Sequence, residues 1–440
     1  MNPRVLNALA VAIGMSAVGS VAAAADADLP TLNAACKAAI QSNDLSVSEH
    51  RCRQAAEAAG QKSKADPEAK AEAYDNLGDV LIAKGKASEA EAIYRRGIAL
   101  RDRAYGKQSV GIAISYDKIG NALVQQKKYA DAEILLNRAL ENRERHFGTQ
   151  SREAADSLNT LGVAAILAGN AVKAETYFSR CVQIREQIFG VRAAETGRAY
   201  QNLAVAIQAT KGNDAAAPVF AKALAALEAS LGSLDLAVAD PVENLARIAT
   251  ARQNPQEANA FWRRALAIRY QKLGPDHVSV AVVLNELGVT AMQLKDLDTA
   301  EQSLRRALAI REKALGANHL LTAEAASNLG IVLYAKGDKA NALTLLRHAA
   351  AVTHVGLGGN NSLTQSRWGN LEEVVKSLAS SAQVAKAPVA ATPERPQNVA
   401  VPAPLPAAAP AQPAPAAKPA APAPKEKAKK EEEKSSFWPF

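Results

Sequence analysis

The feature that most constrains this 440-residue chain is a glycine that recurs every 42 residues. It stands at the seven positions Gly106, Gly148, Gly190, Gly232, Gly274, Gly316 and Gly358. A period of this length is typical of repeat proteins, in which each unit is one supersecondary element stacked on its neighbours. We therefore expect one elongated array with a shared core, rather than the three globular domains that the length alone would allow.

Other residue types share this period. A large aliphatic residue precedes a small one in every unit, as in Leu77-Gly78, and an alanine follows twelve residues after the small one, as in Ala90. A bulky residue such as Tyr94 comes four positions later, on the same face of a helix. Turn sequences such as Lys84-Gly85-Lys86 separate the two stretches. Each unit therefore predicts a hairpin of two closely packed helices, and the periodic glycine suits a left-handed helix C-terminus.

Two Asp-Pro pairs predict the first residues of helices. Asp66-Pro67 and Asp240-Pro241 each combine a favoured N-cap residue with a proline, which is tolerated at the first helical position. We therefore expect one helix to begin at Pro67 and another at Pro241.

The stretch from Ala300 to His319 resembles the tetratricopeptide repeat, in the 42-residue variety found in kinesin light chains. The resemblance covers seven units over residues 71–364 and implies an all-α, right-handed α-solenoid of about seven to eight antiparallel helix hairpins. Residues 26–70 are expected to form a degenerate N-terminal repeat, and residues 365–384 a capping helix. Atypical end units are expected in a solenoid, because its outer faces must be polar.

Residues 1–25 have the pattern of a secretory signal peptide. Arg4 supplies the positive charge, the following 21 residues are uncharged, and the segment ends in the alanine run 22–25. The alternative is an uncleaved membrane anchor, because 21 uncharged residues are just long enough to span a bilayer. Small and polar residues dilute the hydrophobicity and favour cleavage. The protein is therefore expected to be exported, with the periplasm as its location.

Residues 385–440 are expected to be a disordered tail. Thirteen of the 20 prolines lie there, mostly alternating with alanine, so the segment cannot form a core and favours extended polyproline II. A run of lysines and glutamates follows and reads as a solvated spacer. The last residues, Phe437-Trp438-Pro439-Phe440, are either a docking motif for a second partner or a chance ending.

The cysteines suggest one disulfide. When the repeat register is extended back by one unit, Cys36 falls in the small column of the first helix and Cys52 in the bulky column of the second. These columns face each other across a hairpin, and an exported chain meets oxidising conditions. We predict a Cys36–Cys52 disulfide, with two buried free thiols as the alternative. Cys181 lies in the inner alanine column and is expected to be an inert core residue.

Other chemistry-bearing residues have structural interpretations. His277 and His319 follow consecutive repeat glycines, and without further ligands at suitable spacing they indicate loop bonding rather than a metal site. A periodic basic column could suggest nucleic-acid binding, but export and the lack of interleaved aromatics favour an outward helix face. This column contains Arg96, Arg138, Arg180, Lys222, Arg264 and Arg306, followed by His348. No catalytic motif is found, so we expect no enzyme activity, no cofactor and no nucleic-acid partner.

In tetratricopeptide solenoids the first helices line a concave groove that takes extended or helical peptide segments. By that resemblance, we expect the groove here to be lined by residues of the first helices. The candidates are Asp75, Asp79, Asp117, Asn121, Asn159, Val163, Ile166, Asn202, Val205, Asn244, Arg247, Asn285, Val289, Asn328 and Ile331. The asparagines either hydrogen-bond a peptide backbone or brace adjacent repeats. The acidic first repeats predict a ligand that is basic or polar at that end and apolar near Ile166.

These features together predict a non-enzymatic scaffold or adaptor of the bacterial cell envelope. The solenoid would hold a segment of a partner protein. The long tail would tether a second binding site, which raises the effective concentration of the partners without tight contacts. Two alternatives stay open at this point. One is a periplasmic component that presents a soluble peptide or carbohydrate, and the other is a regulatory subunit whose own tail occupies the groove.

Overall fold

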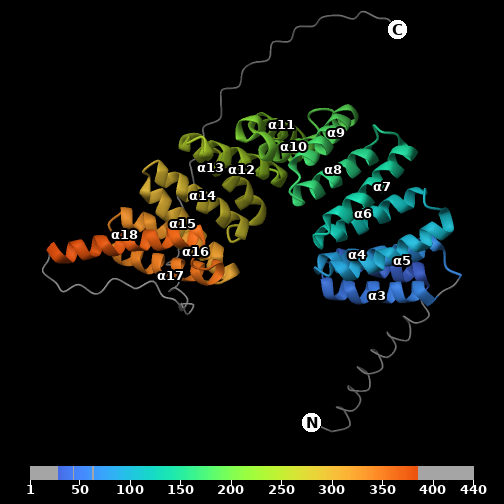
Figure 1. Cartoon of the computed structure of the whole chain (residues 1–440), viewed down its shortest axis with the longest axis horizontal. Helices are drawn as coiled ribbons and strands as arrows, with labels where there is room; N and C mark the ends of the chain where they lie inside the picture. The colour runs from blue at the N-terminus through green and yellow to red at the C-terminus, as the bar shows by residue number, and fades with distance from the viewer. Residues whose placement is uncertain (1–27, 43, 62–63, 385–440) are drawn as a thin grey trace, which may run out of the picture.

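The computed structural model of the chain describes residues 28–42, 44–61 and 64–384. Within these ranges it contains seventeen α-helices and no strand (Figure 1). The predicted signal segment 1–25 and the predicted tail 385–440, including Phe437 to Phe440, lie outside the described residues. No helix of the described part is long and apolar enough to cross a bilayer.

Seven consecutive helix hairpins form the body of the molecule. The first helices have 16 to 18 residues and the second helices have 19. The pairs are α4 Pro67–Ala83 with α5 Ala87–Tyr105, α6 Val110–Gln125 with α7 Tyr129–Phe147, α8 Arg152–Leu167 with α9 Ala171–Phe189, α10 Ala194–Lys211 with α11 Asn213–Leu231, α12 Leu236–Ala251 with α13 Pro255–Leu273, α14 Val278–Gln293 with α15 Leu297–Leu315, and α16 Leu320–Ala335 with α17 Lys339–Leu357.

Both ends of this series carry further helices. α2 Leu29–Gln41 and α3 Leu45–Gln61 form a shorter hairpin that packs on α4. α18 Ser362–Val384 covers α17, so it begins three residues before the predicted start of the capping helix at residue 365. The fold is the predicted all-α solenoid, built by stacking each hairpin on the one before it.

The small column lets the two helices of a hairpin approach closely. A Cβ atom placed on Gly162 would lie 2.4 Å from Phe178, and one placed on Gly78 would lie 2.2 Å from Tyr94. Both aromatic side chains are fully buried in the core. The bulky residue of the second helix therefore fills the space that the small residue of the first helix leaves open, as the column pattern predicts.

The periodic glycines end the second helices. All seven, from Gly106 to Gly358, have a φ angle between +79° and +89°, a region that L-residues with a side chain rarely adopt. Each amide donates a hydrogen bond to the carbonyl four residues earlier, as Gly148 does to Glu144. The prediction that glycine is needed here for a positive φ is confirmed, but the ψ angles of 156° to 164° differ from those of a left-handed helical residue.

One predicted helix start is right and the other is wrong. Asp66 caps α4, whose first residue is Pro67. Pro241, in contrast, is the sixth residue of α12, which begins at Leu236 with Asp235 as its N-cap. Asp235 stands three residues after the periodic glycine, which is where the caps of the other repeats stand, so the repeat register overrides the local Asp-Pro signal.

The hairpins follow one another around an arch (Figure 1). The first helices, such as α6 and α8, lie toward the inside of the arch, and the second helices, such as α7 and α9, lie outside them (Figure 1). The inner side is therefore a surface built mainly from the first helices.

Candidate functional site

One exposed residue per repeat forms a row along the first helices. Asp79, Asn121, Val163, Val205 and Arg247 stand 42 residues apart, and all five are exposed. The next two members of the row, Val289 and Ile331, are half-buried. Since the spacing equals the repeat period, these side chains occupy equivalent places on successive helices. We call this row, with the exposed residues around it, the inner groove.

Two of the predicted groove residues are not part of this surface. Asp75 is only 6% exposed and Asn285 is also buried, so their placement in the open groove is wrong. Both stand one helical turn before the exposed row. Asn285 accepts a hydrogen bond from Asn328 of the next repeat, and Asp75 lies against the second helix of its own hairpin. There, Arg101 Nη1 lies 2.8 Å from Asp75 Oδ2.

The acidic end of the groove is neutralised within the protein. The Asp79 carboxylate accepts hydrogen bonds from Lys118 at 2.5 Å and from the Tyr94 hydroxyl at 2.7 Å. Asp117 forms an ion pair with Arg143, at 2.5 Å between Oδ2 and Nη2. Asp79 and Asp117 thus already have cationic partners within the protein, and the preference for a basic ligand at this end stays a prediction.

Burial also changes the pKa of the Asp117 carboxyl. Desolvation raises the pKa of this carboxyl to about 6, although the nearby Arg143 guanidinium lowers it. Asp117 and Arg143 side chains are each 15% exposed, so water screens their interaction weakly. Asp117 is therefore a structural carboxyl of the hairpin rather than a free groove anion.

An arginine column that the sequence analysis did not single out organises these carboxylates. Arg101, Arg143, Arg185, Arg269 and Arg311 share the 42-residue register. Arg101 bonds Asp75 of its own hairpin and Ser115 of the next one. Arg143 likewise reaches Asp117 and Ser157. The signal was available in the sequence, because acidic residues recur 26 positions before Arg101, Arg143 and Arg269.

The asparagines mainly brace the solenoid. Asn202 Nδ2 donates to Asn159 Oδ1 of the preceding repeat at 2.8 Å, and Asn328 donates to Asn285 in the same way at 3.0 Å. Asn244 instead bonds the backbone of its own helix, at the carbonyl of Asp240. Of the two interpretations left open by the sequence, bracing adjacent repeats is the one that the structure shows for Asn202 and Asn328.

The middle of the inner groove is apolar and open. Val163 is 40% exposed, Leu167 is 53% exposed, and Val205 on the next first helix is 36% exposed. Ile166 is half-buried and packs against the cluster around Phe178. The predicted apolar character near Ile166 is thus carried by its neighbours, and it forms a patch that spans α8 and α10.

The remaining sequence candidates have structural roles. His277 and His319 are N-caps, and the Nδ1 atom of each accepts a hydrogen bond at 3.1 Å from the backbone N–H two residues later. Cys181 is buried, and burial raises the pKa of its thiol to about 11, which makes it a poor nucleophile at neutral pH. No group of metal-binding side chains occurs in the described residues.

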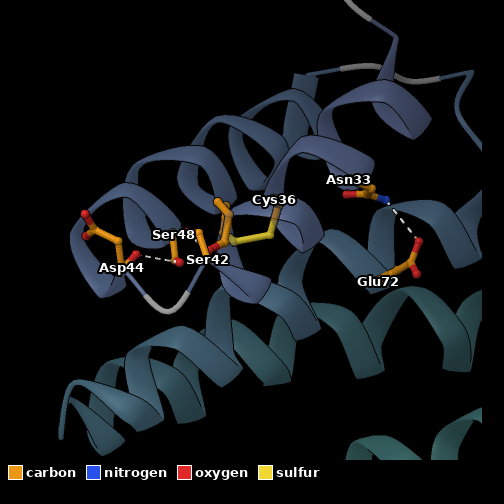
Figure 2. The surroundings of a disulfide bond; sticks show 8 residues. Asn33, Cys36, Ser42, Asp44, Ser48 and Glu72 are labelled. Atoms are coloured by element: carbon orange, nitrogen blue, oxygen red, sulfur yellow. Dashed lines mark hydrogen bonds between the residues drawn. A yellow bond between two sulfur atoms is a disulfide. The ribbon is translucent and has the colours of Figure 1, made fainter.

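The predicted disulfide is present. Cys36 on α2 and Cys52 on α3 are bonded, with their Cα atoms 4.7 Å apart (Figure 2). Figure 2 also shows Asn33 on the same hairpin pointing toward Glu72 of α4, to which it donates a hydrogen bond at 3.2 Å. The disulfide therefore closes the end hairpin, and side-chain hydrogen bonds attach that hairpin to the first regular repeat.

Solved structures with a similar fold share only low sequence identity with this chain. The apo form of RapI has a TM-score of 0.54 and 12% identity, over 80% of this chain and 98% of that one. The apo form of the quorum sensor NprR from B. thuringiensis has a TM-score of 0.54 and 13% identity, over 73% and 86%. A putative kinesin light chain of P. anserina has a TM-score of only 0.42 at 22% identity, over 47% and 97%. No curated protein matches in sequence.

The sequence itself matches a family over most of its length. One model described as tetratricopeptide repeat matches residues 48–145, 153–229, 238–313 and 279–353, and a second matches residues 118–187. These ranges coincide with the hairpins from α3 to α17. The chain belongs to the tetratricopeptide-repeat family.

Proposed function

We propose that this protein is an exported, non-enzymatic scaffold that holds a segment of a partner protein in its inner groove. The observation that carries the proposal is the open apolar patch of Val163, Leu167 and Val205. Single exposed apolar side chains are common on protein surfaces, but side chains at equivalent places on neighbouring first helices together offer a docking place for apolar residues. Membership in a family of interaction repeats supports this assignment.

The chemistry of the groove defines the partner segment. Its acidic residues are already paired with Lys118 and Arg143, so the surface gains little by binding further cations. The apolar patch gains most, because covering it removes apolar area from water, at about 25 cal/mol per Å². We therefore propose a segment that places aliphatic or aromatic residues against α8 and α10.

The experiment is capture of partners from an envelope extract by the purified protein. Replacement of Val163 and Leu167 by aspartate should abolish capture of any groove-bound partner, because a charge would then be buried at the contact. Val172→Asp is the matched control: Val172 is 70% exposed but lies on the second helix α9. Equal capture by both variants would contradict the groove assignment.

The cellular location is part of the proposal. It rests on the signal-like segment 1–25 and on the disulfide of the end hairpin, a bond that persists in oxidising compartments. Cell fractionation of the full chain, with mass spectrometry of its N-terminus, tests it. A cytoplasmic protein that retains residues 1–25 would overturn this part without affecting the groove.

The sequence 385–440 supplies a second attachment point in this proposal, through Phe437-Trp438-Pro439-Phe440. Deletion of these residues should leave groove capture intact and remove a second set of partners. If deletion instead increases groove capture, the tail competes for the groove and acts as an internal inhibitor.

A further inference from the structure

Several residues of the basic column on the second helices contact the segment that precedes their repeat. Arg180 Nη2 lies 2.5 Å from Glu144 Oε1 and 3.3 Å from the Thr149 carbonyl of the preceding loop. Arg306 contacts Asp276 and the Pro275 carbonyl in the same way. His348 bonds the Ala317 carbonyl, and Arg264 pairs with Glu228. In three of these four repeats the column side chain bonds a carbonyl of the inter-repeat loop, whereas the pair of Arg264 is with Glu228 of the preceding helix α11.

Lys222, at the same position of α11, does not make this contact. Its ammonium lies over the Tyr200 ring, 5.7 Å from the centroid. The acid equivalent to Glu144 in this repeat is Glu186, which already accepts a hydrogen bond from the Tyr200 hydroxyl. The surface beside the loop at Val191 is therefore not covered by Lys222, the basic-column residue of this repeat.

Helix α11, which lies beneath this surface, has small side chains where other second helices have large ones. α11 presents Ala226 where α9, α13 and α15 carry the isoleucines Ile184, Ile268 and Ile310. It presents Ala229 where α5 and α7 carry Arg103 and Arg145. The result is an open surface hollow of ≈ 630 Å³.

The acidic side chains around the hollow have hydrogen-bond or ion-pair partners, but its two basic side chains have no acidic partner among the described residues. Arg192 and Lys222 line it, both are exposed, and neither has an acidic partner in the described part of the chain. The two acids of the wall are engaged, Glu186 by Tyr200 and Glu228 by Arg264. In the part of the molecule that the structure describes, Arg192 without an acidic partner, and Lys222 with only the Tyr200 ring as its partner, thus stand beside the exposed Ala225 and Ala229.

We propose that this hollow is a second docking site, which binds an acidic side chain flanked by apolar residues on a partner protein. The carboxylate takes the charge-assisted hydrogen bonds that Arg192 and Lys222 offer, and the flanking apolar groups cover Ala225 and Ala229. The hollow is lined by residues of α9, of the loop after it, of α11 and by Tyr200 of α10, and none of the inner-groove residues Val163, Leu167 and Val205 is among them. One solenoid can then hold two segments, which strengthens attachment through effective concentration.

The test uses calorimetric titration of the full chain with two probe peptides, acetyl-Leu-Glu-Leu-amide and acetyl-Leu-Gln-Leu-amide. The glutamate peptide should bind at least about tenfold more tightly, because ionised acceptors form the stronger hydrogen bonds. Lys222→Met with Arg192→Gln should remove this preference. Both positions are exposed, so thermal melting should show that the variant still folds.

Two controls separate this site from other binding. Arg138→Met removes a cation of the same column two repeats earlier and should leave the affinity unchanged. Ala229→Gln, which fills the hollow without changing its charge, should weaken the glutamate peptide. Equal binding of both peptides, no binding of either, or equal loss in the Arg138→Met variant would overturn the proposal. Loss in Val163→Asp alone would place the peptide in the inner groove instead and would also overturn it.

Discussion

Arg101 and Asp75 form an ion pair in which both side chains are buried, with 2.8 Å between Nη1 and Oδ2. The same Nη1 atom donates to Ser115 of the next hairpin at 2.7 Å, so one guanidinium joins two repeats. Burial raises the pKa of Asp75, and the charge of Arg101 opposes that rise. Burial has the larger effect, so the net pKa of Asp75 lies above its ordinary value even with Arg101 beside it.

Removal of one partner from this pair should be strongly destabilising. Arg101→Leu would leave the Asp75 carboxylate buried without a cation, at a cost of about 3–5 kcal/mol. The fourth regular repeat shows an alternative, because Leu227 and Gln201 occupy the equivalent positions there. The double variant Arg101→Leu with Asp75→Gln should recover most of the loss in urea unfolding. A double variant no more stable than the single one would show that the pair itself is not responsible.

Asp117 should make stability depend on pH. Its pKa in the folded protein is about 6, above the ordinary value of 3.8, because burial disfavours the charged form. A raised folded pKa means that the folded state binds the proton more tightly, so this stabilisation is complete below about pH 4 and is lost as the pH rises through 6. Two pKa units correspond to about 3 kcal/mol.

The comparison is between the wild type and Asp117→Asn, which cannot titrate at this position. Between pH 4 and pH 7 the urea midpoint of the wild type should fall relative to that of the variant. Parallel pH profiles for the two proteins would contradict the assignment of a raised pKa to Asp117.

The repeat register made much of this fold predictable from sequence. The period located the hairpins, and the facing of small and bulky columns placed Gly162 against Phe178 and Cys36 near Cys52. The helix does not begin at Pro241, because the register places its N-cap at Asp235, three residues after the periodic glycine Gly232. Where a local signal and the 42-residue register disagree about a helix start, the register is right.

The groove was less predictable for a physical reason. Asp75 and Asp79 are one helical turn apart and therefore on one side of the same helix, yet Asp75 is buried and Asp79 is exposed. The helix period cannot separate such positions, because the difference depends on how far the second helix reaches around the first. The ion pairs of Asp75 with Arg101 and of Asp79 with Lys118 limit how far these carboxylates can bind a ligand. Such pairs depend on side-chain geometry, which the sequence pattern does not show.

His277 and His319 should each contribute to stability as N-caps. Replacement of either by alanine leaves the backbone N–H of Ser279 or Leu321 without its acceptor, at a cost of about 1 kcal/mol. Aspartate, which caps α12 at the same position as Asp235, should restore the loss. Thermal melting of the alanine and aspartate variants checks this, and an aspartate variant as unstable as alanine would argue against capping.

The disulfide should stabilise the end hairpin. Its two cysteines are separated by 16 residues, and closure of such a loop stabilises by about 3 kcal/mol in the chain-entropy model. Cys36→Ser with Cys52→Ser should therefore increase amide hydrogen exchange in α2 and α3, with little change beyond α6. Non-reducing peptide mapping should find Cys181 as a free thiol; a bridge that contains Cys181 would contradict the assignment.

Gly162→Ala should destabilise the third regular hairpin, because the new methyl would lie 2.4 Å from the Phe178 ring. Overpacking of this kind costs about 1–3 kcal/mol, which outweighs the gain in helix propensity. Gly369→Ala in α18 is the matched control, since no atom lies within 4 Å of its added methyl, and it should be neutral or stabilising. Urea unfolding of both variants tests the contrast. If Gly162→Ala were as stable as Gly369→Ala, the close approach of α8 and α9 at Gly162 would not be required for the fold.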